Sequence, residues 1–177
     1  MIRNLKDRFS RAGIDIRLFL AAIAVASFAG SIVESVFNNF LNDTFNPTSL
    51  LRTTMEVPRE IPGLIVMFVS ALLFFLCSHR LAAFAMLLAS MGLVLMASFS
   101  DTFKLMLVWL FIYSLGQHLM IPLQSSIGMD LAREGQTGRR LGQLNAIRNL
   151  FAIGGSFFVF LGFRFVHLNF TVSFLIS

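Results

Sequence analysis

Residues Leu18–Phe40 read LFLAAIAVASFAGSIVESVFNNF, a run of 23 residues with a single charged side chain, Glu34. A helix needs about 20 mainly apolar residues to cross the roughly 30 Å hydrocarbon core of a bilayer. This run has that length and composition. It therefore predicts a membrane-spanning helix.

The segment before this run, residues 1–17, is basic, so the run resembles the apolar core of a signal peptide. The basic segment is long, however, and the apolar run continues past any alanine-rich cleavage site. We therefore interpret the run as an uncleaved first helix. Residues 1–17 form a basic cytoplasmic segment, either as a helix lying on the inner membrane surface or as a solvated tail.

Further apolar runs follow along the chain. They are Ile61–Cys77, Leu81–Phe99, Leu105–Gly128, Leu144–Phe163 and a run from Leu168 to Ser177. The last run reaches only about 15 Å as a helix, which is too short to span a bilayer, so we expect the intact protein to continue. The sequence predicts an all-α membrane protein. It has one membrane domain over residues 1–177, a polytopic bundle of five complete spans and a truncated sixth.

The composition supports the same class. The 177 residues are 56% hydrophobic and 13% charged, whereas soluble domains carry about 25% charge. This excludes a large soluble enzyme, a disordered tail and a disulfide scaffold, and the single Cys77 forms no internal disulfide. The net charge of +5 does not indicate a nucleic-acid partner, because the basic residues lie between the apolar runs.

The positions of lysine and arginine predict the orientation. With a cytoplasmic N-terminus, the inner segments hold 10 basic residues and the outer segments hold 4. Cytoplasmic loops carry the excess of positive charge, so we expect the N-terminus inside. The longest connections are expected near Asn42–Arg59 outside and Met129–Gln143 inside, with Gly135, Gly138 and Gly142 loosening the second one.

Polar residues inside an apolar run are costly in lipid and usually face the bundle interior or an aqueous cavity. The first helix carries four at steps of four, three and four residues, which share one side of a helix. They are Ser27, Ser31, Glu34 and Asn38. Two interpretations remain open: the wall of a permeation or binding cavity, and an interhelical hydrogen-bond seam.

Glu34 stands out because no other acid lies so deep in an apolar run. One hypothesis makes it a proton carrier in the aqueous pathway. The alternative is a structural acid paired with an arginine or a hydroxyl group.

The fourth run places Tyr113, Gln117 and Gln124 on one side, together with Trp109. Pro122 interrupts this helix and frees backbone carbonyls near a possible cavity. Amides and aromatic rings in such a place suit a polar organic solute. Interhelical hydrogen bonding is the alternative.

The fifth run carries Asn145, Arg148 and Asn149 on one face. Arg148 lies about two turns into this helix. It either extends toward the membrane interface or presents its charge to an anionic solute.

Small residues at helical spacing predict close helix contacts. Three sets occur, in the first, third and fifth runs. They are Ala22, Ala26 and Gly30; Ala82, Ala85, Ala89 and Gly92; and Gly154, Gly155 and Ser156.

No phosphate-cradling loop, nucleophile motif, metal-ligand spacing or carboxylate pair occurs in the sequence. We therefore expect no enzymatic activity, no cofactor and no metal.

The chain resembles the N-terminal half of a major facilitator superfamily transporter. The resemblance is carried by the helix spacing, a short basic break at Ser78-His79-Arg80, the longer basic loop before the fifth run, the phrase Met55–Gly63, and Asn38-Asn39-Phe40 at the end of the polar line. The last two features are similar to bacterial members, so the resemblance implies the bacterial inner membrane.

The resemblance also implies a function. Two six-helix halves would rock around a small-molecule site near the bilayer midplane, with polar residues from the first, fourth and fifth helices. Its partners would be the solute, protons or another coupling ion, the lipid bilayer and the missing C-terminal half. Two other classes stay open: a small homo-oligomeric transporter or channel, and a non-transporting membrane scaffold or assembly protein.

Overall fold

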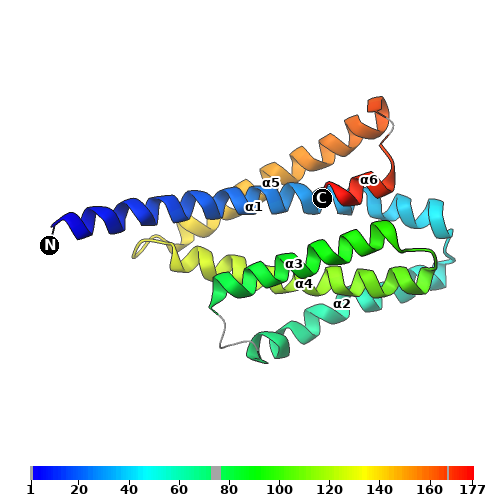
Figure 1. Ribbon diagram of the computed structural model, residues 1–177, viewed down its shortest axis with the longest axis horizontal. Coiled ribbons are helices and arrows are strands. Elements are labelled where there is room, and N and C mark those ends of the chain that lie inside the picture. Colours follow the sequence, from blue (N-terminus) through cyan, green and yellow to red (C-terminus); the bar gives the residue numbers. More distant parts are fainter. Residues whose placement is uncertain (1, 73–76, 167) are drawn as a thin grey trace.

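The computed structural model describes residues 2–72, 77–166 and 168–177, and the regular elements in these ranges are helical (Figure 1). They are α1 (Ile2–Phe45), α2 (Ser49–Leu72), α3 (Ser78–Ser98), α4 (Phe103–Asp130), α5 (Thr137–Leu161), the π-helical turn η1 (Gly162–Val166) and α6 (Phe170–Leu175). Among the described residues, four segments are long and apolar enough to cross a membrane: Ile14–Phe45, Ser78–Ser98, Phe103–Asp130 and Thr137–Val166. The predicted all-α class is confirmed, and these helices fit an integral membrane protein.

Helix α1 is longer than the predicted span at both ends. It includes residues 2–17, which continue the helix away from the bundle (Figure 1). The segment contains leucine, lysine, arginine and alanine, which favour helix, and no proline interrupts it. The helix ends where Asn46 takes a positive φ of 41°, directly before Pro47.

The expected outer loop over Asn42–Arg59 is wrong. Only residues 46–48 connect α1 to α2, and α2 contains both Pro58 and Pro62. A proline removes one hydrogen bond from a helix, and neighbouring helices can re-satisfy the backbone there. The hydroxyl of Ser114 on α4 donates to the carbonyl of Arg59, between the two prolines. The last part of the predicted span Ile61–Cys77 includes residues 73–76, which lie outside the described residues.

The expected inner loop is also shorter than predicted. Residues 131–136 connect α4 to α5, so Gly138 and Gly142 lie inside α5. Glycine in a helix costs only about 1 kcal/mol relative to alanine, and the surrounding residues continue the helix. Gly135, with φ +72°, makes the turn.

The break between α3 and α4 lies at residues 99–102, close to the gap expected between the runs Leu81–Phe99 and Leu105–Gly128. Thr102 caps α4, since its hydroxyl accepts a hydrogen bond from the Leu105 N–H at 3.3 Å. The predicted break Ser78-His79-Arg80 is instead the first turn of α3, with Cys77 as its N-cap.

Helices α3 and α4 pack with their backbones in close approach, as the small residues of α3 predicted. A Cβ added at Gly92 would lie 2.5 Å from the backbone nitrogen of Tyr113. One added at Gly116 of α4 would lie 2.5 Å from the backbone nitrogen of Ala89. Ala85 is fully buried between the two helices. This packing prediction is confirmed.

Helices α1 and α5 form the second close pair. Gly155 is the contact point, because an added Cβ would lie 2.5 Å from the carbonyl oxygen of Phe28. A Cβ at Gly154 would make an ordinary contact of 3.8 Å with the Phe28 ring. The set Ala22, Ala26 and Gly30 is not a packing line: Ala22 is exposed, and an added Cβ at Gly30 would meet nothing within 4 Å.

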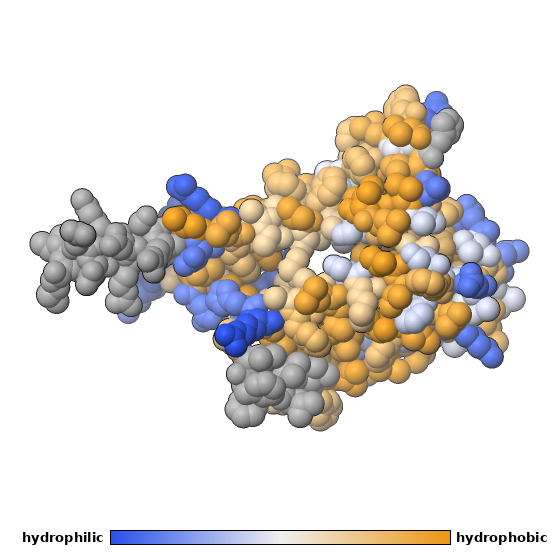
Figure 2. All heavy atoms as spheres, viewed as in Figure 1, coloured by the Kyte–Doolittle hydropathy of each residue, from blue (hydrophilic) through white to orange (hydrophobic). Residues whose placement is uncertain are grey.

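The bundle thus has two groups of helices, α1 with α5 and α2 with α3 and α4, and α6 contacts both α1 and α3. The groups also meet where the side chain of Leu144 on α5 contacts Gly128 on α4. Near α6, aromatic rings pack tightly, with Phe40 and Phe174 centroids 5.0 Å apart. In Figure 2, hydrophobic side chains cover the middle of the visible face and hydrophilic ones gather toward its two ends. An opening separates the two groups in that view.

Candidate functional site

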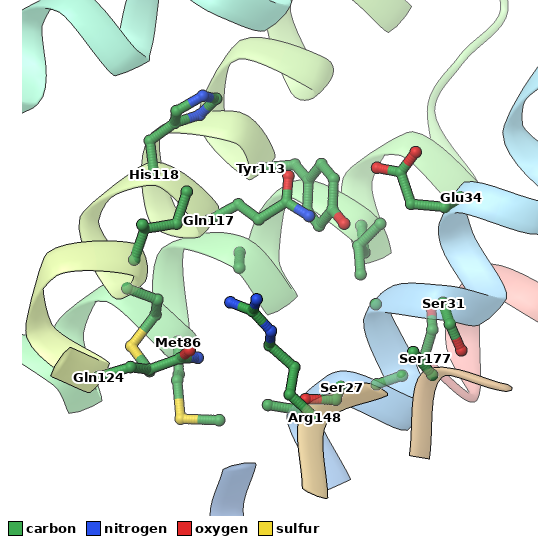
Figure 3. Close-up of a pocket in the computed structure, with 18 of the residues that line it drawn as sticks. Ser27, Ser31, Glu34, Met86, Tyr113, Gln117, His118, Gln124, Arg148 and Ser177 are labelled. Atoms are coloured by element: carbon green, nitrogen blue, oxygen red, sulfur yellow. The ribbon is translucent and has the colours of Figure 1, made fainter. Parts of the chain in front are cut away.

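A cavity of about 630 Å³ lies between the two helix groups. Its lining comes from α1, α2, α3, α4 and α5, mostly from residues near the middle of these helices, and Ser177 adds one residue from the end of the chain. The volume falls within the range of about 300–1,000 Å³ typical of small-molecule sites. Most of the wall is apolar, and charged and amide side chains project into it (Figure 3).

Eight of the ten candidate residues line this cavity: Ser27, Ser31, Glu34, Tyr113, Gln117, Gln124, Arg148 and Asn149. Asn38 and Asn145 do not, and both are exposed. Asn38 lies one turn beyond Glu34 on α1, and Asn145 lies one turn before Arg148 and Asn149 on α5. The polar faces predicted for both helices therefore extend past the ends of the cavity.

The serines of α1 donate their hydroxyl protons within their own helix. Ser27 donates to the carbonyl of Ile23 at 2.7 Å, and Ser31 donates to that of Phe28 at 2.8 Å. Their oxygens keep acceptor capacity toward the cavity. One turn further along, Ser35 donates to the hydroxyl of Ser156 at 3.1 Å, so one hydrogen bond joins α1 to α5 at the cavity wall.

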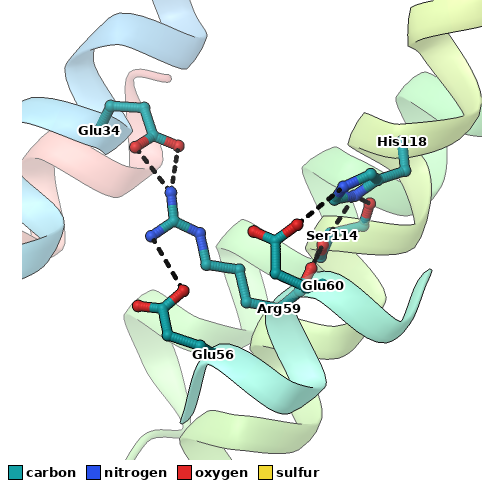
Figure 4. A network of polar contacts seen from close by, with 6 residues as sticks. All are labelled: Glu34, Glu56, Arg59, Glu60, Ser114 and His118. Carbon is teal, nitrogen blue, oxygen red and sulfur yellow. Dashed lines mark hydrogen bonds and ion pairs between the residues drawn. The ribbon is translucent and has the colours of Figure 1, made fainter. Parts of the chain in front are cut away.

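Glu34 pairs with Arg59 of α2 (Figure 4). One guanidinium nitrogen, Nη2, donates to both carboxylate oxygens at 2.9 and 3.1 Å. The Nη1 nitrogen lies 3.9 Å from the carboxylate of Glu56, and the guanidinium carbon lies 6.0 Å from the Phe37 ring centroid. Arg59 thus connects α1 to α2 with two carboxylates and an aromatic ring around it.

A second polar network joins α2 to α4. His118 Nδ1 lies 2.9 Å from the carbonyl oxygen of Ser114 and 3.0 Å from its hydroxyl. Because a carbonyl only accepts, we assign the ring proton to Nδ1. Nε2 then faces the carboxylate of Glu60 at 3.7 Å, which is an ion pair when the ring is protonated.

Arg148 projects from α5 into the cavity, with its guanidinium directed toward Gln117 (Figure 3). Among the residues that the structure describes, it forms no ion pair. The cavity therefore contains a positive charge that no carboxylate of the described chain neutralises directly.

Sequence reasoning missed the contributions of α2 and α3 to the wall. Arg59 and Glu60 of α2, and Met86 and Ser90 of α3, line the cavity. Arg59 was missed because it was placed in the expected outer loop over Asn42–Arg59, and Glu60 because it lies directly before the predicted span Ile61–Cys77. Trp109, predicted on the cavity side of α4, is not among the lining residues; its indole Nε1 donates to the Phe99 carbonyl at 2.9 Å.

Within residues 2–72, 77–166 and 168–177, no group of three or more His, Cys, Asp or Glu side chains is placed to hold a metal ion. Comparison of the chain with protein-family models, curated proteins and solved structures found no match. The helices fit an integral membrane protein, and a largely apolar cavity with charged and amide side chains lies between its two helix groups.

Proposed function

We propose that the protein transports a small solute by alternating access, and that these helices form the N-terminal half of a major facilitator-type bundle with five complete spans and part of a sixth. The observation that carries the proposal is the cavity at mid-height between two helix groups, with charged and amide side chains in its wall. Such residues are costly inside a membrane and usually mark a solute or ion pathway.

The cavity favours a polar organic solute with an anionic group. Arg148 supplies a positive charge without an ion-pair partner in the described chain, and Gln117, Gln124 and Asn149 supply amides around it. The apolar remainder of the wall would accommodate the carbon skeleton. The carboxylate of Glu60 on α2 would disfavour a second anionic group on that side of the cavity.

The proposed topology puts the N-terminus and the connection at residues 131–136 in the cytoplasm of a bacterial cell, and the connection at residues 46–48 outside. Arg59 and Arg148 line the cavity, so they no longer count as loop charges. Without Arg148, 9 basic residues lie inside, and without Arg59, 3 lie outside. This distribution favours the same orientation.

The test is accessibility from the two sides of the membrane. A single cysteine at Gln117, in the full-length protein with Cys77→Ala, is treated with an impermeant maleimide from either side of right-side-out vesicles. Alternating access predicts that the maleimide labels position 117 from both sides. It also predicts that one and the same solute protects this position from labelling on either side.

Leu119→Cys is the matched control on the same helix, because Leu119 is fully buried and should stay unlabelled. Labelling of position 117 from one side only, under all conditions, would contradict the proposal. That result would instead favour a scaffold or assembly protein with a fixed pocket.

A further inference from the structure

A second cavity, of about 220 Å³, lies away from the first, where the α4–α5 connection meets α1. Three of its six lining residues are arginines, and none is acidic. The lining consists of Ile16, Arg133, Gln136, Arg139, Arg140 and Gln143. We call this site the arginine pocket. Within the described part of the chain, its arginines form no ion pair.

Arg140 is the most informative member of the pocket. Its Nη1 donates to the side-chain oxygen of Gln143 at 2.8 Å. Its Nε is buried and has no hydrogen-bond partner. A buried donor without an acceptor is unfavourable and rare in proteins, so Arg140 is held in this position at a cost.

The backbone around the pocket also favours a negative charge. Helix α5 begins here at Thr137, and the side chain of Gln136 makes no capping hydrogen bond to it. The first N–H groups and the dipole of a long helix attract anions. The turn at Gly135 folds the connection back, and the Gln136 N–H donates to the Arg133 carbonyl at 2.9 Å.

The position along α1 places the pocket near a membrane surface. Ile16 lies two residues before Leu18, where the long apolar run of α1 begins, and Arg17 lies between them. Basic pockets between membrane-spanning helices bind the anionic headgroups of lipids at this level.

We propose that the arginine pocket binds a phosphate group. Arginine matches phosphate through parallel N–H donors, and three arginines without an ion pair in the described chain line this pocket. The phosphate can belong to an anionic phospholipid or to a soluble phosphate. The proposal is independent of transport, because none of the pocket's residues lines the larger cavity.

The first arm of the test measures lipid binding by native mass spectrometry of the full-length protein in detergent. Phosphatidylglycerol is compared with phosphatidylcholine. Each arginine near an anionic membrane surface contributes about a fivefold factor in affinity. Changing all three arginines to glutamine should therefore weaken phosphatidylglycerol binding by about a hundredfold.

The second arm titrates lipid-free protein with inorganic phosphate and pyrophosphate, and then adds phosphatidylglycerol. Binding of phosphate that competes with the lipid assigns the pocket to soluble phosphates. Binding of phosphatidylglycerol alone assigns it to lipid.

Two variants make the test specific. Changing Arg52, Lys104 and Arg164 to glutamine removes the same charge elsewhere and should leave binding unchanged. Arg140→Lys keeps the charge but removes Nε. It replaces the triple variant as the test if that variant does not fold, and it should still weaken binding. Two results would overturn the proposal. In the first, the unmodified protein does not bind phosphate and binds phosphatidylglycerol no better than phosphatidylcholine. In the second, Arg140→Lys and the triple variant bind as the unmodified protein does.

Discussion

A single guanidinium nitrogen of Arg59 on α2 donates to both carboxylate oxygens of Glu34 on α1, at 2.9 and 3.1 Å. Among the ion pairs of the described residues, this is the one that joins the α1–α5 pair to the group of α2, α3 and α4. This charge-assisted contact therefore adds to the apolar core that packs α1 against α3 and α4 beside the cavity. Separating α1 from α2 requires breaking it.

Glu34→Gln should ease this separation without unfolding the protein. The Glu34 side chain is 51% exposed and that of Arg59 is 28% exposed, and partly exposed ion pairs contribute about 1 kcal/mol or less. We expect a small change in unfolding free energy and faster maleimide labelling of a cysteine at position 117. Glu56→Gln is the control, because Glu56 contacts Arg59 only at 3.9 Å within α2. Equal labelling rates in both variants would show that the pair does not restrain the cavity.

The same substitution tests whether Glu34 carries protons. Glutamine keeps the shape of the side chain but cannot titrate. If Glu34 couples transport to protons, the variant in proteoliposomes should lose the pH dependence of solute uptake while its expression and folding remain normal. An unchanged pH profile in a well-folded variant would falsify the coupling hypothesis and leave Glu34 as the partner of Arg59.

Arg148→Gln should weaken binding of an anionic solute by about tenfold or more, because hydrogen bonds to charged groups contribute about 1.5–3 kcal/mol. Thermal-shift titration with a panel of small organic acids would measure this effect and identify the solute. Arg164→Gln is the control, since Arg164 lies in η1 outside the cavity. If both variants respond equally to every acid, Arg148 is not the anion-binding group.

Gly155→Ala should destabilise the protein by about 1–3 kcal/mol, the usual cost of overpacking. The new methyl group would meet the carbonyl oxygen of Phe28, which is backbone and cannot rotate away. Gly154→Ala should have little effect, because its methyl group would make only an ordinary contact at 3.8 Å. Thermal unfolding in detergent distinguishes the two, and coinciding midpoints would mean that α1 and α5 do not pack through Gly155.

The small-residue sets show how much of the helix packing can be predicted from sequence periodicity. Ala85, Ala89 and Gly92 were predicted to pack, and they contact α4. The set Ala22, Ala26 and Gly30 has a similar helical spacing on α1, but Ala22 is exposed and a Cβ at Gly30 would meet nothing within 4 Å. Small residues permit close approach, whereas the choice of partner depends on where the other helices lie. Spacing along one helix contains no information about that choice.

The polar residues illustrate the same limit. The lining residues of α1, α4 and α5 could be predicted because one helical face collects them at regular steps. Arg59 could not, because its importance depends on a contact with Glu34, 25 residues away. Arg59 was also counted in the expected outer loop, although prolines such as Pro58 and Pro62 are tolerated within membrane helices when other groups satisfy the backbone.

The backbone contacts of Gly92 and Gly116 have a mechanical consequence. They leave α3 and α4 no clearance to slide or tilt against each other, and the Ser114 hydroxyl ties α2 to the same unit. Gln117 and His118 therefore belong to a rigid unit of three helices, α2, α3 and α4. For the cavity to change width in the proposed transport, we expect α1 and α5 to move together against this three-helix unit, and the apolar core between α1 and the α3–α4 pair to repack.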